Sequence, residues 1–193
     1  SEIMIIADKF SNPEWLASDL IGQAEHDDLA QCILISKDEK NIFKVKYEIE
    51  KQLRNIPRRN IAKKSLSTYG ILMYVKSEKK IVEIINTIAP EHLELNTKNF
   101  QKILSKVKNS GSICLGKYAV MAMTDYNVGS NHILPTNGSA KYSSGISVNE
   151  FYKRISYINL SKKGIESLGP SVITLANYEG LVAHAQSVVK RIR

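Results

Sequence analysis

Short apolar runs alternate with amphipathic segments along the first 116 residues. The near-continuous apolar run at 2–7 predicts a strand that is covered on both faces, as in a parallel sheet. Further runs predict strands at 32–36, 70–75 and 113–115. Each is separated from the next by segments with a helical spacing of apolar residues.

Five such segments are expected to be helices. In the first, Ser11 or Asn12 is placed to cap the helix, Pro13 lies in its first turn, and the helix should run to about His26. The strands and helices together predict an α/β fold, in which a parallel sheet is layered by helices. The expected helices cover 13–26, 42–53, 61–67, 78–88 and 100–107.

The character of the chain changes after Gly116. Residues 125–145 are rich in Gly, Ser, Asn, Thr and Tyr and show no sustained period, which predicts a functional loop. From Ser147 the pattern predicts helices: the first carries Phe151, Ile155 and Ile158, a short one lies at 165–168, and a last one lies at 170–189. We therefore expect an α/β domain at 1–146 and a helical carboxy-terminal extension at 147–193.

Composition indicates a globular protein with an ordinary core, since 43% of the 193 residues are hydrophobic and 24% are charged. The chain contains no run of roughly 18 apolar residues, as a membrane span requires, and its first residues do not resemble a signal peptide. Cys32 and Cys114 lie in apolar runs, which favours buried thiols over a disulfide. These features predict a cytoplasmic protein that does not associate with membranes.

The net charge of +8 would favour an anionic partner. The cations are nevertheless spread along amphipathic segments, apart from one cluster that has no interleaved aromatic residues. A solvated surface is therefore favoured over a nucleic-acid site. The cluster comprises Lys51, Arg54, Arg58, Arg59, Lys63 and Lys64.

Gln23 and His26 are spaced to share one face near the end of the first helix. An amide oxygen and an imidazole nitrogen would suit a divalent metal such as zinc. A histidine near a helix carboxyl end is also favoured for electrostatic reasons alone, so the spacing leaves both interpretations open.

Glu91 and His92 follow Pro90 and combine two groups that are able to transfer protons. Neighbouring residues of a regular strand point to opposite faces, so both would serve one site only where the backbone is irregular. The alternative is an exposed pair in a loop.

Asp125 and His132 belong to the polar segment TDYNVGSNHILPT, which also contains Tyr126 and Asn131. Such a loop beyond the end of a strand would occupy the usual ligand position of an open α/β sheet, and Asp125 would suit a metal. The alternative is an Asx-capped turn. The last helix carries Glu179 and His184, whose spacing of five places them on different stripes.

Taken together, QAEH, PEHLE, DYNVGSNHILPT with GSAKYSSGISV, and YEGLVAH resemble the histidinol dehydrogenase family in order and spacing. The resemblance implies a Rossmann-like sheet, oxidation of L-histidinol to L-histidine with NAD, one zinc ion per site, and a homodimer with exchanged tails. It implies zinc ligands at Gln23, His26 and Asp125, with His184 supplied by the other subunit. It makes His92 the base and Glu91 the group that activates water. The substrate contacts implied are Ser1, Gln23, His26, His92, Asp125, Glu179 and His184.

Two differences from the family pattern matter. Family chains are longer on the amino side, where most of the NAD site lies, so we expect a truncated form that is inactive alone or completed by a separate amino-terminal half. The stretch KYAVMAMT carries Val120, Met121 and Thr124 where the family has Pro-Glu and Gly. No G-x-G-x-x-G motif follows a strand. The alternative function is a non-catalytic remnant or a zinc- or imidazole-binding module.

Overall fold

The computed structural model describes residues 1–192 and contains two compact units. The first comprises Ser1–Glu150, and the second begins at Phe151. The first unit holds the sheet and all elements up to α6, whereas the second holds two helices.

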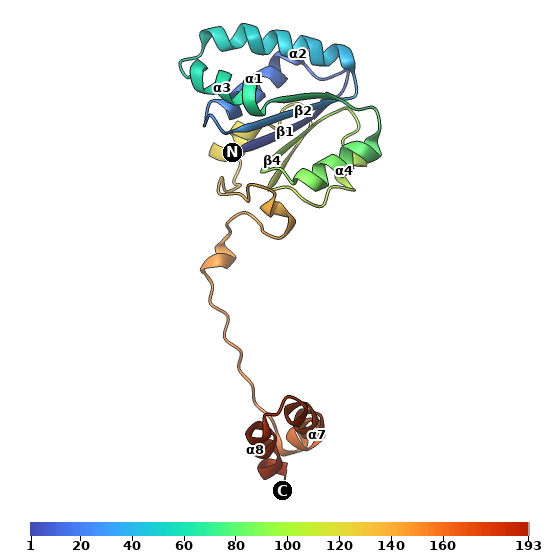
Figure 1. The fold of residues 1–193 in the computed structure, drawn as a ribbon, viewed down its shortest axis with the longest axis vertical. Helices are drawn as coiled ribbons and strands as arrows, with labels where there is room; N and C mark the ends of the chain where they lie inside the picture. Colours follow the sequence, from blue (N-terminus) through green and yellow to red (C-terminus); the bar gives the residue numbers. More distant parts are fainter. Residues whose placement is uncertain (193) are drawn as a thin grey trace. The chain divides into compact units, whose positions relative to one another are not determined.

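The first unit is built on a five-stranded parallel sheet with the strand order β3-β2-β1-β4-β5 (Figure 1). The register pairs Ile3 of β1 with Cys32 of β2 on one side and with His92 of β4 on the other. These three side chains therefore lie in one row on the same face. The strands are β1 (Glu2–Ala7), β2 (Gln31–Ser36), β3 (Ile71–Tyr74), β4 (His92–Asn96) and β5 (Ser112–Leu115).

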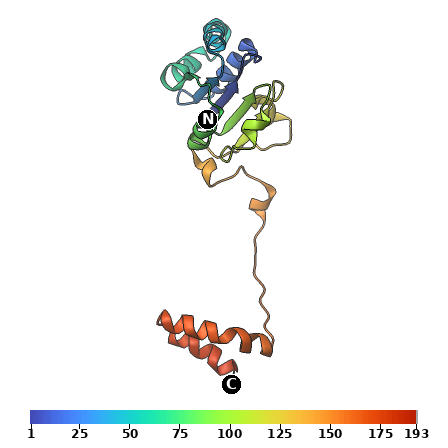
Figure 2. The same ribbon diagram turned by 90° about the vertical axis from the view of Figure 1, so that its right-hand side faces the viewer.

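Helices cover both faces of this sheet, as Figures 1 and 2 show. One apolar core joins α1 and α2 to β1 and β2 through residues such as Leu16, Val45 and Ile5, and a second core joins α4 to the opposite face through Ile81 and Leu93. The helices of this unit are α1 (Pro13–Ala24), α2 (Glu39–Gln52), α3 (Arg59–Tyr69), α4 (Glu78–Ile88), α5 (Gln101–Leu104) and α6 (Met121–Tyr126), with 3-10 turns η1 (Leu53–Asn55), η2 (Ser139–Lys141) and η3 (Val148–Phe151).

Side-chain caps fix where the helices begin. Asn12, Asp38 and Ser77 each accept a hydrogen bond from a backbone N–H in the first turn of α1, α2 and α4 respectively. Helix α4 ends at Ile88, and the next residue, Ala89, has a left-handed backbone with φ of 55°, directly before Pro90. That turn delivers Glu91 and His92 to the start of β4.

The predicted α/β fold is confirmed, but three details of the first unit differ. Strand β4 was not expected, because the polar residues of HLELN interrupt the apolar pattern that predicts a buried strand. All five of its residues are nevertheless buried. Helix α1 ends at Ala24, and His26 lies in the following turn with its N–H on the carbonyl of Gln23. Asp125 lies in the short helix α6 and not in a loop.

The second unit comprises α7 (Lys162–Tyr178) and α8 (Val182–Ile192). A break between two helices was expected just before Pro170, but Pro170 lies inside α7. The break comes instead near Gly180, whose φ is 76°, between α7 and α8. Gly169 faces Val188 and Ile192 closely enough that a Cβ would lie 2.3 Å from the Ile192 Cδ1 atom.

The helix expected around Ile155 is wrong, since residues 152–161 have no regular structure. Phe151, Ile155 and Ile158 are all exposed, so a helix here would bury no apolar face, and short helices gain most of their stability from such burial. Cys32 and Cys114 are buried free thiols. Within residues 1–192, no helix has the length and apolar character needed to cross a membrane.

Candidate active site

Most of the residues singled out in the sequence surround one cavity of about 420 Å³ in the first unit. The cavity lies at the amino ends of β1 and β4, because Ser1 precedes β1 and His92 is the first residue of β4. The usual ligand position of an open α/β sheet is at the carboxyl ends of its strands, so this cavity lies at the opposite edge. The lining residues are Ser1, Gln23, His26, Glu91, His92, Asp125, Tyr126 and His132.

Glu91 is held by the backbone next to β1. The N–H of Glu2 donates to Glu91 Oε2 at 2.9 Å, and the N–H of Glu91 donates to Glu2 Oε2 at 3.3 Å. Glu91 is 7% exposed, and burial raises the pKa of its carboxyl group, while the hydrogen bond from Glu2 opposes this shift. The carboxylate is therefore a stronger base than an exposed glutamate.

His92 is buried, and each of its ring nitrogens has a different neighbour. Its Nδ1 atom lies 3.1 Å from Ser112 Oγ in β5. Its Nε2 atom lies 3.9 Å from Asp125 Oδ1 and 4.0 Å from Glu91 Oε1. Burial lowers the pKa of His92, which the Asp125 carboxylate opposes and His26 reinforces. The ring is thus kept neutral at neutral pH and is able to accept a proton.

Asp125 reaches the cavity because α6 runs back along the sheet face covered by α1. The helix begins at Met121, whose N–H donates to Glu94 Oε1 at 2.8 Å in the middle of β4. Four residues later, Asp125 lies beside His92 at the start of that strand. Of the substituted residues, Val120 is the extended residue directly before α6, and Met121 and Thr124 are part of the helix, in which Thr124 Oγ1 donates to the carbonyl of Met121.

Gln23, His26 and Asp125 offer a donor set of the kind that zinc accepts. Gln23 is 1% exposed, and its Oε1 atom is buried without a hydrogen-bond partner, so it is an acceptor available for a cation. The described residues contain no cluster of three His, Cys, Asp or Glu side chains placed for a metal. The set in this unit has two such residues and one amide, and it leaves at least one coordination position for another ligand.

The cavity also has two lining residues to which the sequence assigned no role. Tyr126 follows Asp125 in α6, and His132 lies in the polar segment after it. Both side chains are exposed, so they form part of the rim. Their place in the motif was visible in the sequence, but no spacing rule connected them to Gln23 or His92.

Glu179 and His184 belong to the second unit. Glu179 caps the carboxyl end of α7, and His184 is an exposed residue of α8. Their suggested contacts with substrate and metal remain predictions.

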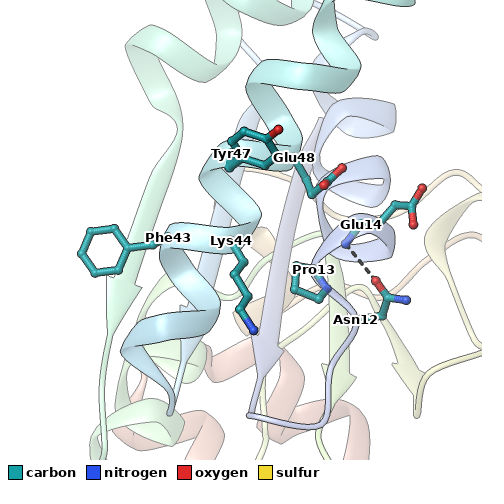
Figure 3. A pocket seen from close by; sticks show the side chains of 7 residues that line it. All are labelled: Asn12, Pro13, Glu14, Phe43, Lys44, Tyr47 and Glu48. Carbon is teal, nitrogen blue, oxygen red and sulfur yellow. Dashed lines mark hydrogen bonds between the residues drawn. The ribbon is translucent and has the colours of Figure 1, made fainter.

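A second cavity, of about 490 Å³, lies between the start of α1 and the middle of α2 (Figure 3). Asn12 Oδ1 accepts the N–H of Glu14 there, and Phe43 extends away from the other labelled side chains. Its lining has no imidazole, thiol or buried carboxylate, and we assign no chemistry to it. The lining residues are Asn12, Pro13, Glu14, Phe43, Lys44, Tyr47 and Glu48.

Comparison with known proteins agrees with the motifs. A family model described as histidinol dehydrogenase matches residues 1–192. The chain is 76% identical over 193 residues to histidinol dehydrogenase of Pelagibacter ubique and 44% identical over 188 residues to that of Listeria monocytogenes. These matches cover 100% and 97% of this chain but 45% and 44% of the relatives, so the chain spans less than half of their length.

The fold agrees as well. The crystal structure of histidinol dehydrogenase from Elizabethkingia anophelis superposes with a TM-score of 0.91 at 38% identity, over 100% of this chain and 44% of that one. With the family model matching nearly every residue, the chain belongs to the histidinol dehydrogenase family.

Proposed function

We propose that this chain carries the metal-binding and acid–base part of a histidinol dehydrogenase, which oxidises L-histidinol to L-histidine with NAD. One observation carries the proposal: Glu91, His92 and Asp125 meet within about 4 Å at a cavity that Gln23 and His26 also line. A neutral imidazole, a buried carboxylate and a free amide oxygen at one cavity suit a reaction that removes protons from a polar substrate.

In the first oxidation, His92 would accept the proton of the substrate hydroxyl group; NAD, when bound, would supply the hydride acceptor. The lowered pKa of His92 supports this role, because the imidazole is free to take up a proton at neutral pH. Ser112 orients the ring through Nδ1, which leaves Nε2 directed toward Asp125 and Glu91. Asp125 also stabilises the imidazolium once it forms.

In the second oxidation, Glu91 would remove a proton from the water that attacks the aldehyde carbon, and the resulting hydrate would give its hydride to a second NAD when bound. The raised pKa of Glu91 increases its basicity, and its position is fixed by the N–H of Glu2 on Oε2, which leaves Oε1 for the water. Ser1 lines the same cavity, which supports its proposed contact with the substrate.

Gln23, His26 and Asp125 would hold one zinc ion, with His184 of a second copy as a further ligand. When bound, zinc would supply Lewis acidity and a fixed anchor for the nitrogen atoms of the substrate. Most of the NAD site would lie outside this chain, in an amino-terminal part or a separate polypeptide. The second unit would form a homodimer by exchange.

The test is a chimaera in which this chain is joined to the amino-terminal part of the Pelagibacter ubique relative. We expect NADH formation that depends on L-histidinol, with two NADH per substrate. In the Glu91→Gln variant, the first oxidation should be affected less than the second, so the yield should fall toward one NADH and the aldehyde should accumulate.

The chain without that part should release no NADH. A folded chimaera that binds zinc but forms no NADH would contradict the proposal and favour a metal- or imidazole-binding module.

A further inference from the structure

A pair of acidic side chains lies on the same helix and strand as residues that line the cavity, without lining it. Asp19 is on α1, four residues before Gln23, and Glu94 is on β4, two residues after His92. Glu94 is 1% exposed, and the two carboxyl groups are within hydrogen-bonding reach of each other. Two adjacent acids, of which Glu94 is fully buried and Asp19 half-buried, need an explanation, because burying one charge is costly and placing a like charge beside it is more so.

The buried oxygen atoms of the pair have fewer hydrogen-bond donors than they need. Glu94 Oε1 accepts the N–H of Met121, but Glu94 Oε2 and Asp19 Oδ2 are both buried without a donor. An ionised carboxylate only accepts hydrogen bonds, whereas a protonated one also donates. One proton between the two groups would supply the missing donor and remove one of the two charges.

Burial and the neighbouring charges also favour a pair that holds a proton. Burial and then the Asp19 charge raise the pKa of Glu94 to about 8, and burial raises that of Asp19 to about 6. Cys114, which pairs with Glu94 across β4 and β5, has its pKa raised to about 12 and stays a neutral thiol. Burial is the largest cause of the Cys114 shift, and the negative charges of Glu94, Asp19 and Asp125 add to it.

We propose that Asp19 and Glu94 share one proton and that Glu94, held in this way, positions α6 so that Asp125 meets His92. The pair connects three elements that carry the site. Asp19 belongs to the helix of Gln23, Glu94 to the strand of His92, and the Met121 N–H that Glu94 accepts belongs to the first residue of the helix of Asp125. Glu94 is a positioning residue and touches neither substrate nor metal.

The shared proton makes a prediction about stability that is independent of metal. A carboxyl group whose pKa is raised on folding binds its proton in the folded chain and not in the unfolded one at pH values between its two pKa values. For Glu94 this interval runs from about 4.5 to about 8. The unfolding equilibrium constant of the parent chain should therefore increase about tenfold more per pH unit in this interval than that of Glu94→Gln.

Glu94→Gln is the informative variant because glutamine keeps an acceptor for Met121 and brings its own donor for Asp19. Glu94→Met has a similar volume and lacks both. Urea unfolding between pH 5 and 8 measures how the unfolding equilibrium constant changes with pH. Amide hydrogen exchange of Met121 measures whether its hydrogen bond to Glu94 is kept. Glu14→Gln, at an exposed residue of α1, is the matched control and should keep the parent slope.

We expect Glu94→Gln to lose the extra slope and to keep the Met121 amide protected. Glu94→Met should increase the exchange of that amide at least tenfold and weaken binding of Zn²⁺ alone at least tenfold, whereas Glu94→Gln should stay within about twofold of the parent. The zinc-binding measurement rests on the proposed function, whereas the pH dependence of unfolding and the hydrogen exchange of Met121 do not.

If unfolding of Glu94→Gln depends on pH as steeply as unfolding of the parent chain, Asp19 and Glu94 do not share a proton. Unchanged Met121 exchange in folded Glu94→Met would overturn the positioning role. If Glu94→Met does not fold, Asp19→Asn decides in its place, because its amide donor satisfies Glu94 and should leave Met121 protected while the pH slope falls. Loss of Met121 protection in Asp19→Asn would overturn the proposal.

Discussion

Glu91 and His92 are consecutive in the sequence and yet direct their side chains to the same cavity, with Glu91 Oε1 4.0 Å from His92 Nε2. Two neighbours in a regular strand would point to opposite faces. Here Glu91 lies in the bend before β4, after the left-handed turn at Ala89, and only His92 belongs to the strand. The end of α4 therefore determines that the Glu91 and His92 side chains reach the same cavity.

The Asp125 carboxylate raises the pKa of His92 against the effect of burial. Asp125→Asn should lower the His92 pKa further, because the substitution removes an opposite charge close to the ring. NMR titration of the imidazole in metal-free protein measures it. Asp28→Asn is the control, since that carboxylate pairs with Lys64, and an equal shift in both variants would contradict the assignment.

The contact of Ser112 Oγ with His92 Nδ1 should stabilise the first unit. Ser112→Ala removes the partner of a buried ring nitrogen and should reduce the free energy of unfolding by about 1 to 2 kcal/mol. Urea denaturation measures the change, with Ser18→Ala at an exposed position of α1 as the control. An effect no larger than that of the control would show that the ring is oriented by packing alone.

The parts of the fold that followed from the sequence are those with strong local periodicity. Strand β1 lies where its apolar run predicted, and α4 covers the predicted range, Glu78–Ile88. Strand β4 was missed because His92 and Glu94 face the site and the buried acid pair, and their polarity removed the apolar signal. Its burial depends on partners more than 70 residues away, such as Asp19, which no local pattern reveals.

The site residues were found mainly through the resemblance of four motifs. Their convergence at the amino ends of the strands was not predictable from spacing, because it depends on the return path of α6. That path is set by the bond from the Met121 N–H to Glu94, a contact across 27 residues. The helix around Ile155 was predicted from periodicity alone and is absent, since nothing within the described residues covers its apolar positions.

Gly111 is needed because the backbone of Glu91 passes directly over it. A Cβ atom at Gly111 would lie 2.6 Å from the carbonyl oxygen of Glu91 and 3.2 Å from Pro135 Cδ. Gly111→Ala should therefore shift Glu91 and destabilise the unit by about 1 to 3 kcal/mol. Thermal and urea unfolding test this.

Gly22→Ala is the matched control, because a Cβ there would meet no atom within 4 Å. It lies in α1 and should stabilise the unit by up to about 1 kcal/mol. Similar effects of the two substitutions would mean that the close approach at Gly111 is relieved at no cost.

Helix α7 exposes the apolar side chains of Leu168, Val172 and Leu175, which recur at helical spacing on one stripe. We expect this stripe to be covered in a dimer. Leu168→Lys with Leu175→Lys should weaken self-association at least tenfold in sedimentation velocity, whereas Asn177→Lys, on another side of the helix, should not. A parent chain that stays monomeric at high concentration would contradict this expectation.

Zinc binding tests the central claim most directly, because His26 and His132 line the same cavity but only His26 belongs to the proposed ligand set. Equilibrium dialysis at neutral pH should give about one Zn²⁺ per parent chain. His26→Ala should abolish this binding, and His132→Ala should retain it. No uptake by the parent chain, or equal loss in both variants, would contradict a metal site formed by Gln23, His26 and Asp125.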